Sequence, residues 1–317
     1  MVLVCAVLGF NFVAGKVAVG ALPPLLVVAL RFSILGLVLA PFVKWHRRRM
    51  GSVLAVASFT GFLHFALTFC AFTQVDASVM AIASQLSVPM STVLSILVLG
   101  ESVRWRRWTG IALAFAGILV ISLDGELEAT PMGLLAVALS ALSYAVGMIF
   151  IRRLAGVPAL TLQAWTALAS APVLLVASLA FETGQGAALA AASPTALAAV
   201  AYTALGSSLV GHAGFAWLLQ RYEVSLTAPL SLMTPVFGVL FGVSLLGDPV
   251  TGRFLLGGLL TLGGVAIVAL RQRARPARPA AGAGAPLAPQ GLGLDARAVL
   301  ADSARSGSDR KSEEDGQ

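Results

Sequence analysis

Long apolar runs separated by short polar connections fill the first 270 residues of the chain. Ten runs can be counted, and most approach the roughly 20 apolar residues that a helix needs to cross a bilayer. Their approximate bounds are 1–20, 24–43, 52–73, 77–99, 108–123, 132–151, 160–181, 196–219, 225–246 and 254–270. The pattern therefore predicts an all-α polytopic membrane protein with ten transmembrane helices.

Two stretches, 78–100 and 225–247, resemble each other and are both interrupted by proline. Their sequences are SVMAIASQLSVPMSTVLSILVLG and SLTAPLSLMTPVFGVLFGVSLLG, at an offset of 147 residues. The helix-breaking prolines are Pro89 in the first and Pro229 and Pro235 in the second. Because each half holds five runs, the second copy would enter the membrane from the opposite side. The sequence thus predicts two inverted five-helix repeats, 1–123 and 132–270. Helices broken at corresponding places in two halves are typical of the binding sites of secondary transporters.

The same alignment continues into the fifth and tenth runs, where small residues recur at positions i, i+4 and i+7. The two stripes are Gly110, Ala114 and Gly117, and Gly257, Thr261 and Gly264. Small residues at this spacing let helices approach closely. We expect the stripes to pack within the bundle, with a homodimer interface as the alternative.

Charge alternates from one connection to the next. Basic residues collect in one set of connections: Lys44, Arg47, Arg48, Arg49, Arg104, Arg106, Arg107, Arg152, Arg153 and Arg221. The opposite connections hold Arg253 together with Asp76, Asp124, Glu126, Glu128, Glu182 and Asp248. An excess of Lys and Arg marks cytoplasmic loops. The protein is therefore expected in the inner or plasma membrane, crossing it many times, with both termini in the cytoplasm.

Residues 271–317 have a different composition, dominated by Pro, Ala, Gly, Ser and charged residues. Such a segment is too polar and too rich in Pro and Gly to build a packed core. It is predicted to be a disordered cytoplasmic tail whose basic beginning can lie against anionic lipid headgroups.

The composition narrows the function classes. Of the 317 residues, 58% are apolar and 11% are charged, whereas soluble proteins carry roughly 25% charged residues. The net charge of +7 does not form a basic patch interleaved with aromatic residues, so nucleic-acid binding is not expected. The chain contains no P-loop, H-E-x-x-H, C-x-x-C or G-x-S-x-G motif, so no enzymatic activity, catalytic residue, metal or cofactor is predicted.

Two further features concern processing and cysteine chemistry. The first run begins directly after Met1 without a basic region, so no cleavable signal is expected. Cys5 and Cys70 are predicted to lie near opposite membrane faces, so no disulfide between them is expected.

Polar residues inside the runs are informative because each is costly in hydrocarbon. This set comprises Asn11, His64, Gln85, Tyr144, His212 and Ser231. Gln85 and Ser231 each precede a proline by one turn, and the two histidines fall at nearly corresponding places in the two halves. One interpretation is hydrogen bonding between helices. The other, which we favour for the group, is a common substrate-binding cavity.

Two basic residues also lie inside runs. Arg31 is about 7 residues into the second run, which is roughly 10 Å deep, and Lys16 is nearer the outer end of the first. Each could snorkel or bond backbone carbonyls, or it could act as a gate or an anion contact. No Asp or Glu lies well inside any run. If transport is coupled to protons rather than to a counter-substrate, His64 and His212 are the leading candidates.

Local motifs connect these features to a known family. They are GFNFVAGKVAVGALPPLLVVALRF at 9–32, LGESV at 99–103, GIALAFAGILVI at 110–121 and RYEVSLTAPLSLMTPVFGVL at 221–240. With ten spans in two halves, the chain resembles the EamA branch of the drug/metabolite transporter superfamily. The first and last motifs are similar to those of bacterial amino-acid metabolite exporters, which release cysteine and O-acetylserine. The resemblance implies a central cavity between the halves, reached by the first, third, fourth, sixth, eighth and ninth spans, which carry the six polar residues.

We therefore expect a secondary transporter that exports small amino-acid-related metabolites by alternating access. The two halves would rock about the broken fourth and ninth helices. One alternative is transport of a drug, nucleoside or sugar in either direction. A membrane-embedded enzyme or a scaffold is a further alternative, against which the inverted repeat and the lack of an intramembrane acid pair both count.

Overall fold

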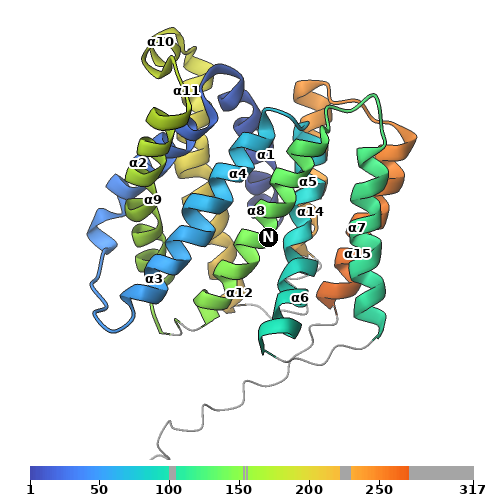
Figure 1. The fold of residues 1–317 in the computed structure, drawn as a ribbon, viewed down its shortest axis with the longest axis horizontal. Coiled ribbons are helices and arrows are strands. Elements are labelled where there is room, and N and C mark those ends of the chain that lie inside the picture. Colours follow the sequence, from blue (N-terminus) through green and yellow to red (C-terminus); the bar gives the residue numbers. More distant parts are fainter. Residues whose placement is uncertain (100–104, 153, 155, 222–229, 271–317) are drawn as a thin grey trace, which may run out of the picture. The chain divides into compact units, whose positions relative to one another are not determined.

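The computed structural model describes residues 1–270 except 100–104, 153, 155 and 222–229. The predicted tail, 271–317, thus lies outside the described residues. Within the described part the chain is helical, apart from one isolated antiparallel bridge between Val75 and Ala129. Figure 1 shows the helices packed side by side in one bundle.

The helices follow the predicted runs. In the first half they are α1 (Val2–Ala21), α2 (Pro24–Leu39), α3 (Met50–Val56), α4 (His64–Phe72), α5 (Ala77–Ala83), α6 (Ser87–Leu99) and α7 (Trp105–Ser122). In the second half they are α8 (Pro131–Arg152), α9 (Ala159–Phe181), α10 (Gln185–Ala191), α11 (Pro194–Ala201), α12 (Gly214–Arg221), α14 (Met233–Phe241) and α15 (Gly252–Leu270). Short segments join or extend them: the 3₁₀ turns η1 (Ala40–Phe42) and η3 (Ser84–Leu86), and the π-helical segments η2 (Ala57–Leu63), η4 (Tyr202–Ala213) and η5 (Gly242–Leu246).

Eight helical stretches of the described part are long and apolar enough to cross a membrane. They are Val2–Ala21, Pro24–Phe42, Met50–Phe72, Ala77–Val98, Pro131–Ile151, Ala159–Phe181, Pro194–His212 and Gly252–Ala269. Met233–Leu246 is apolar but shorter, and α7 carries Arg106 and Arg107 in its first turn. The protein is therefore a multi-pass, all-helical membrane protein.

The small-residue stripes pack against each other, as α7 lies along α15. A Cβ atom built on Gly117 would come within 2.4 Å of the Gly257 carbonyl oxygen, and one on Gly264 within 2.4 Å of the Gly110 oxygen. Thr261 sits in the same contact and donates to the Gly257 carbonyl at 2.8 Å. Only glycine permits so close an approach at these points, which confirms the expectation of packing within the bundle.

At the predicted break of the fourth span the α-helix becomes a 3₁₀ turn. η3 (Ser84–Leu86) separates α5 from α6, and Pro89 is the third residue of α6. Proline has no N–H, so the Gln85 carbonyl loses its regular helical donor. In the second half Pro235 is likewise the third residue of α14, whereas Pro229 lies outside the described residues.

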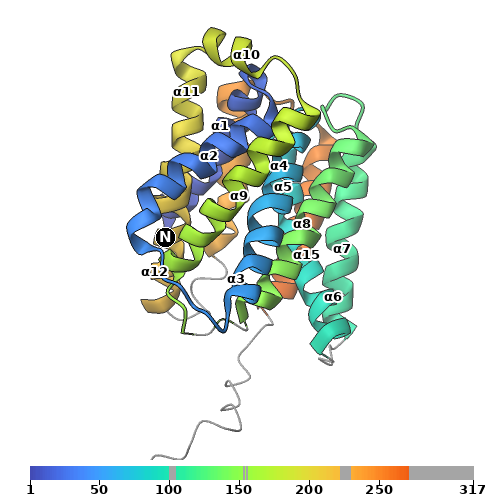
Figure 2. The same ribbon diagram turned by 60° about the vertical axis from the view of Figure 1, so that its left-hand side comes forward.

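The bundle has two chemically distinct ends (Figures 1 and 2). At the acidic end lie the connections α4–α5, α7–α8, α9–α10 and η5–α15, which hold Asp76, Asp124, Glu126, Glu128, Glu182 and Asp248. At the basic end lie the α2–α3 connection and the start of α7, which hold Lys44, Arg47, Arg48, Arg49, Arg106 and Arg107.

A polar network closes the acidic end. Lys16 Nζ lies 2.5 Å from Glu128 Oε2 and donates to the Val75 carbonyl at 3.0 Å. The Glu128 N–H donates to Asp76 Oδ2 at 2.9 Å. Asp248, which follows the ninth predicted span, accepts at 2.8 Å from a backbone N–H in the first turn of α5. The network therefore ties α1, the connection between the halves, the start of α5 and the second half together.

Candidate functional site

Two adjoining cavities lie inside the bundle and share four lining residues, His64, Phe65, Tyr144 and His212. One, the Gln85 lobe, has a volume of about 230 Å³ and is reached by Asn11, Thr68, Ser84, Gln85, Ser140 and Thr234. The other, the Arg31 lobe, has a volume of about 280 Å³ and is reached by Arg31, Thr60, Gln163, Thr166 and Ser208. The shared residues stand where the lobes meet, so groups in both lobes can act on one bound molecule.

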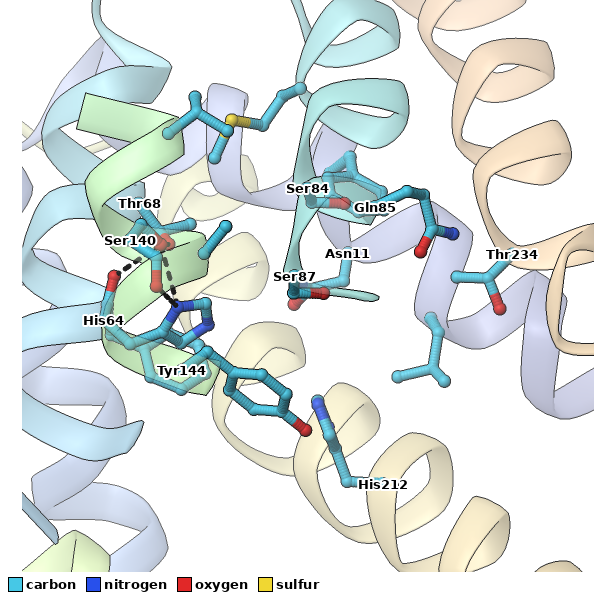
Figure 3. Close-up of a pocket in the computed structure, with 16 residues that line it drawn as sticks. Asn11, His64, Thr68, Ser84, Gln85, Ser87, Ser140, Tyr144, His212 and Thr234 are labelled. Carbon is cyan, nitrogen blue, oxygen red and sulfur yellow. Dashed lines mark hydrogen bonds between the residues drawn. The ribbon is translucent and has the colours of Figure 1, made fainter. Parts of the chain in front are cut away.

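The structure brings five of the six predicted cavity residues together in the Gln85 lobe. They are Asn11, His64, Gln85, Tyr144 and His212. Figure 3 shows them converging from different helices, with the Tyr144 hydroxyl directed toward the His212 ring. Ser231 does not line either lobe; Thr234, beside Pro235, lines the Gln85 lobe in its place.

Several hydroxyl residues of the cavity escaped the sequence analysis, although helical spacing could have indicated them. Ser140 precedes Tyr144 by four residues, and Thr68 follows His64 by four. Ser208 precedes His212 by the same interval. Residues four apart share a helix face, so each is the one-turn neighbour of a residue that was identified.

His64 is held rigidly by its neighbours. Its Nδ1 lies 2.8 Å from Ser140 Oγ and 3.1 Å from the Ser140 carbonyl oxygen, and Thr68 Oγ1 is 2.6 Å from Ser140 Oγ (Figure 3). The ring also packs against Phe65 and Tyr144, at centroid distances of 4.8 and 5.1 Å. Because a carbonyl can only accept, the contact with it favours a proton on Nδ1, which leaves Nε2 as an acceptor in the neutral ring.

His212 makes a similar contact in the second half, here with a carbonyl of its own segment, η4. Its Nδ1 lies 2.9 Å from the Ser207 carbonyl oxygen, which again favours the proton on Nδ1 and an accepting Nε2. His64 directly follows the π-helical segment η2, and His212 lies within the π-helical segment η4. Wide turns of this kind are frequent at functional sites. The two halves thus present a pair of imidazole acceptors to the cavity.

Arg31 is almost completely buried, with 1% of its surface exposed. Its Nη2 donates to Ser208 Oγ at 3.1 Å and its Nη1 to Asn11 Oδ1 at 3.4 Å. The guanidinium carbon lies 4.5 Å from the centroid of the Phe65 ring, a cation–π distance. Among the described residues, its Nε has no hydrogen-bond partner.

The helix that carries Arg31 is fixed at its start. Glu182, which ends α9, accepts from the N–H groups of Leu25 and Leu26 at 2.7 and 3.1 Å. A carboxylate in the first turn satisfies free donors and interacts favourably with the helix dipole. The position of Arg31 is therefore determined by α9 as well as by packing around α2.

Lys16, the other predicted gate residue, does not line either lobe; it belongs to the network at the acidic end. Arg31 and the two histidines are the ionisable groups of the cavity, together with the Tyr144 phenol, and none of the described residues that line either lobe is Asp or Glu. Within the described part, no cluster of three His, Cys, Asp or Glu side chains could hold a metal ion.

Comparison with known proteins identifies relatives of this chain. The model of the EamA-like transporter family matches residues 1–123 and 131–270. A probable amino-acid metabolite efflux pump of Escherichia coli is 31% identical over 278 residues, which cover 84% of this chain and 92% of that protein. The Salmonella typhimurium protein of the same name is 32% identical over 275 residues, with the same two coverages.

Two more distant relatives agree with the membrane setting and the fold. An uncharacterized inner membrane transporter of Escherichia coli, YedA, is 26% identical over 280 residues, covering 86% of this chain and 90% of that protein. One solved crystal structure, at 24% identity, superposes on 86% of this chain and 97% of its own with a TM-score of 0.57. At that identity the structural similarity supports the fold alone.

Proposed function

Since the chain belongs to the EamA-like transporter family, we propose that this membrane transporter exports small amino-acid-related metabolites by alternating access. The observation that carries the proposal is the cavity inside the bundle, which polar side chains from both halves of the chain reach. The names of the two efflux-pump relatives support the direction and the substrate class.

We further propose ten spans in two inverted repeats, 1–123 and 132–270. The packing of the helices supports this. The first span, α1, packs against α14 and η4 of the second half, while the sixth, α8, packs against α6 and α4 of the first. The second span packs against the seventh, and the fifth against the tenth. Exchanging the two halves maps this set of neighbours onto itself, as inverted repeats require.

The basic end is proposed to face the cytoplasm, with both termini on that side, because Lys and Arg are retained in cytoplasmic loops. The Arg31 lobe includes Val56, Ile151 and Ala159, which lie on α3, α8 and α9 toward the basic end. The opposite end is held by the Lys16–Glu128 ion pair and the Asp248 cap of α5. In this scheme the structure represents a state closed to the outside, and export requires these contacts to open.

The dimensions of the cavity suit a small-molecule solute. Together the two adjoining lobes, of about 230 and 280 Å³, fall within the roughly 300–1,000 Å³ typical of pockets for small molecules. Its hydroxyl, amide and imidazole groups suit a polar molecule rather than a lipophilic drug. The proline positions at the start of α6 and α14 provide the two places where a span can bend.

Counterflow in proteoliposomes tests the proposal. The full chain is reconstituted and preloaded with cysteine, O-acetylserine, threonine or the cationic dye ethidium, with and without a proton gradient. We expect counterflow of at least one of the amino acids and none of ethidium. Gln85→Ala should lower that counterflow, whereas Leu97→Ala, a lipid-exposed change on the same span, should not. Absence of counterflow for every amino acid would refute the proposal.

A further inference from the structure

The guanidinium of Arg31 is a buried cation for which the described residues provide no anionic partner. Its hydrogen-bond acceptors, Ser208 Oγ and Asn11 Oδ1, and its aromatic neighbour, Phe65, are all neutral. The acidic side chains of the described part lie at the acidic end. A charge at the centre of a bilayer is costly, and such charges are normally paired or face a functional cavity.

The hydrogen bonding of Arg31 is also incomplete. A guanidinium carries five N–H donors in a planar fork. In the described part of the chain Nε lacks an acceptor, and each terminal nitrogen has one, at 3.1 or 3.4 Å. An unsatisfied buried donor is destabilising. Carboxylates bind a guanidinium through two parallel N–H···O bonds, so a carboxylate on the terminal nitrogens, each of which has one acceptor among the described residues, would supply the missing charge.

The rest of the cavity complements such a ligand. The Nε2 atoms of neutral His64 and His212 are hydrogen-bond acceptors, and both rings line the Arg31 lobe as well as the Gln85 lobe. An ammonium group can donate to them while the carboxylate lies on Arg31. A solute with a positive charge alone would meet Arg31 without any compensating acid among the described lining residues.

We infer that Arg31 is the specificity-determining residue that binds the carboxylate of the transported solute. The inference rests on the proposed transport function and deepens it. The transporter accepts free carboxylates, zwitterionic amino acids among them, and discriminates against the corresponding esters, amides and decarboxylated amines.

A competition experiment on the unmodified protein provides the first test. Counterflow of labelled cysteine is measured under reducing conditions against unlabelled cysteine, cysteine methyl ester and cysteamine. A bond between a charged group and its partner is worth enough to change affinity roughly 10- to 100-fold, so the ester and the amine should compete at least about tenfold less well. Equal competition by all three compounds would overturn the inference while leaving amino-acid transport intact.

Variants of Arg31 separate substrate recognition from structural support. Arg31→Gln should bring the competition ratio of acid to ester close to one, and Arg31→Lys should keep part of it, because the charge remains without the fork. Lys16→Gln, which removes a cation outside the cavity, should leave the ratio unchanged. If the Arg31 variants weaken all three competitors equally, Arg31 is structural and the inference is wrong.

A further set of substrates distinguishes failure of the inference about Arg31 from failure of the proposed transport function. Lactate, a carboxylate without an ammonium group, and glycerol are tested as substrates alongside the amino acids. Transport of lactate without any amino acid would contradict the proposed metabolite class but support the role of Arg31. Transport of glycerol alone would contradict both.

Discussion

Lys16 on α1 and Arg31 on α2 are both cations inside the first two spans, and the bundle provides for them differently. Lys16 has a carboxylate 2.5 Å away, on Glu128, and a carbonyl at 3.0 Å. Arg31 has a hydroxyl, an amide oxygen and an aromatic face. Where a charge serves the structure, the chain itself supplies its counter-charge.

The same difference separates the acidic end from the cavity. Carboxylates of the acidic end have defined partners: Asp76 and Asp248 accept backbone N–H groups of other segments, and Glu182 caps α2. The cavity holds a cation and two imidazoles without a carboxylate among its described lining residues. Carboxylates of the acidic end are therefore paired within the protein, whereas the described lining residues of the cavity give Arg31 no acidic partner, and in the proposed scheme a solute provides it.

The difference between Lys16 and Arg31 would be removed most directly by giving Arg31 an acidic partner within the protein. Ser208 Oγ lies 3.1 Å from Arg31 Nη2, so Ser208→Asp would place a carboxylate beside the guanidinium. We expect amino-acid counterflow to fall about 10- to 100-fold, since the internal carboxylate occupies the donors. The thermal unfolding temperature should not decrease. Ser208→Asn, of similar size but neutral, is the matched control, and undiminished transport by the Asp variant would contradict the expectation.

Removing an imidazole acceptor should have a smaller effect, about tenfold, because it deprives the ammonium of one bond. His212→Phe retains a ring without an acceptor and should weaken amino-acid counterflow more than that of a carboxylate without an ammonium group. The dependence of counterflow on pH should also flatten, since a protonated imidazole no longer accepts. His46→Ala, in the α2–α3 connection, is the control. Equal losses for both substrate types would argue against the contact.

Sequence reasoning located the helices and most of the cavity because polar residues within apolar runs are conspicuous. His64, Gln85 and His212 lie in the cavity for that reason. Ser231 does not line it, whereas Thr234, three residues later and next to Pro235, does. Proximity to the proline did not distinguish the two positions.

The two basic residues show the other limit of sequence reasoning. Lys16 and its partner Glu128 are separated by 112 residues and by most of the first half of the chain. Such a pair arises only from tertiary packing, so the sequence placed Lys16 nearer the membrane surface than Arg31 but could not identify its partner.

Breaking the Lys16–Glu128 ion pair should change the affinity for solute little. Its larger effect should be on the equilibrium between the closed and open states of the acidic end. The two side chains are 21% and 48% exposed, and pairs of this kind contribute about 0.2–1 kcal/mol. Glu128→Gln should therefore lower thermal stability slightly and increase labelling of a cysteine introduced at Ala129, a buried residue next to Glu128. A double-mutant cycle with Lys16→Gln measures the pair itself. A coupling energy of zero would mean that the ion pair does not hold the acidic end closed.

The smallest expected effect concerns the pH dependence of the acidic end. Burial raises the pKa of the Asp76 carboxyl, and the charges of Asp248 and Glu128 raise it further, while the Glu128 N–H and Lys16 lower it. Because the pKa is higher in the folded protein, stability is lost as pH rises from about 3.9, the ordinary value, through the raised one. Asp76→Asn keeps the acceptor for the Glu128 N–H but cannot ionise. As pH increases through this range, the unfolding temperature of the Asp76→Asn variant should therefore rise relative to that of the unmodified protein.

Asp124→Asn is the control of opposite sign at the same end. The Thr251 hydroxyl bond lowers the pKa of Asp124, so the carboxylate contributes stability above the ordinary value and loses it as pH falls through the lowered one. The Asn variant should be the less stable protein at neutral pH and approach the unmodified protein in acid. Thermal unfolding in detergent between pH 3 and 7.5 measures both curves. Parallel curves for the two variants would show that burial does not set the ionisation of Asp76, and that the acidic end is as well solvated as an ordinary loop.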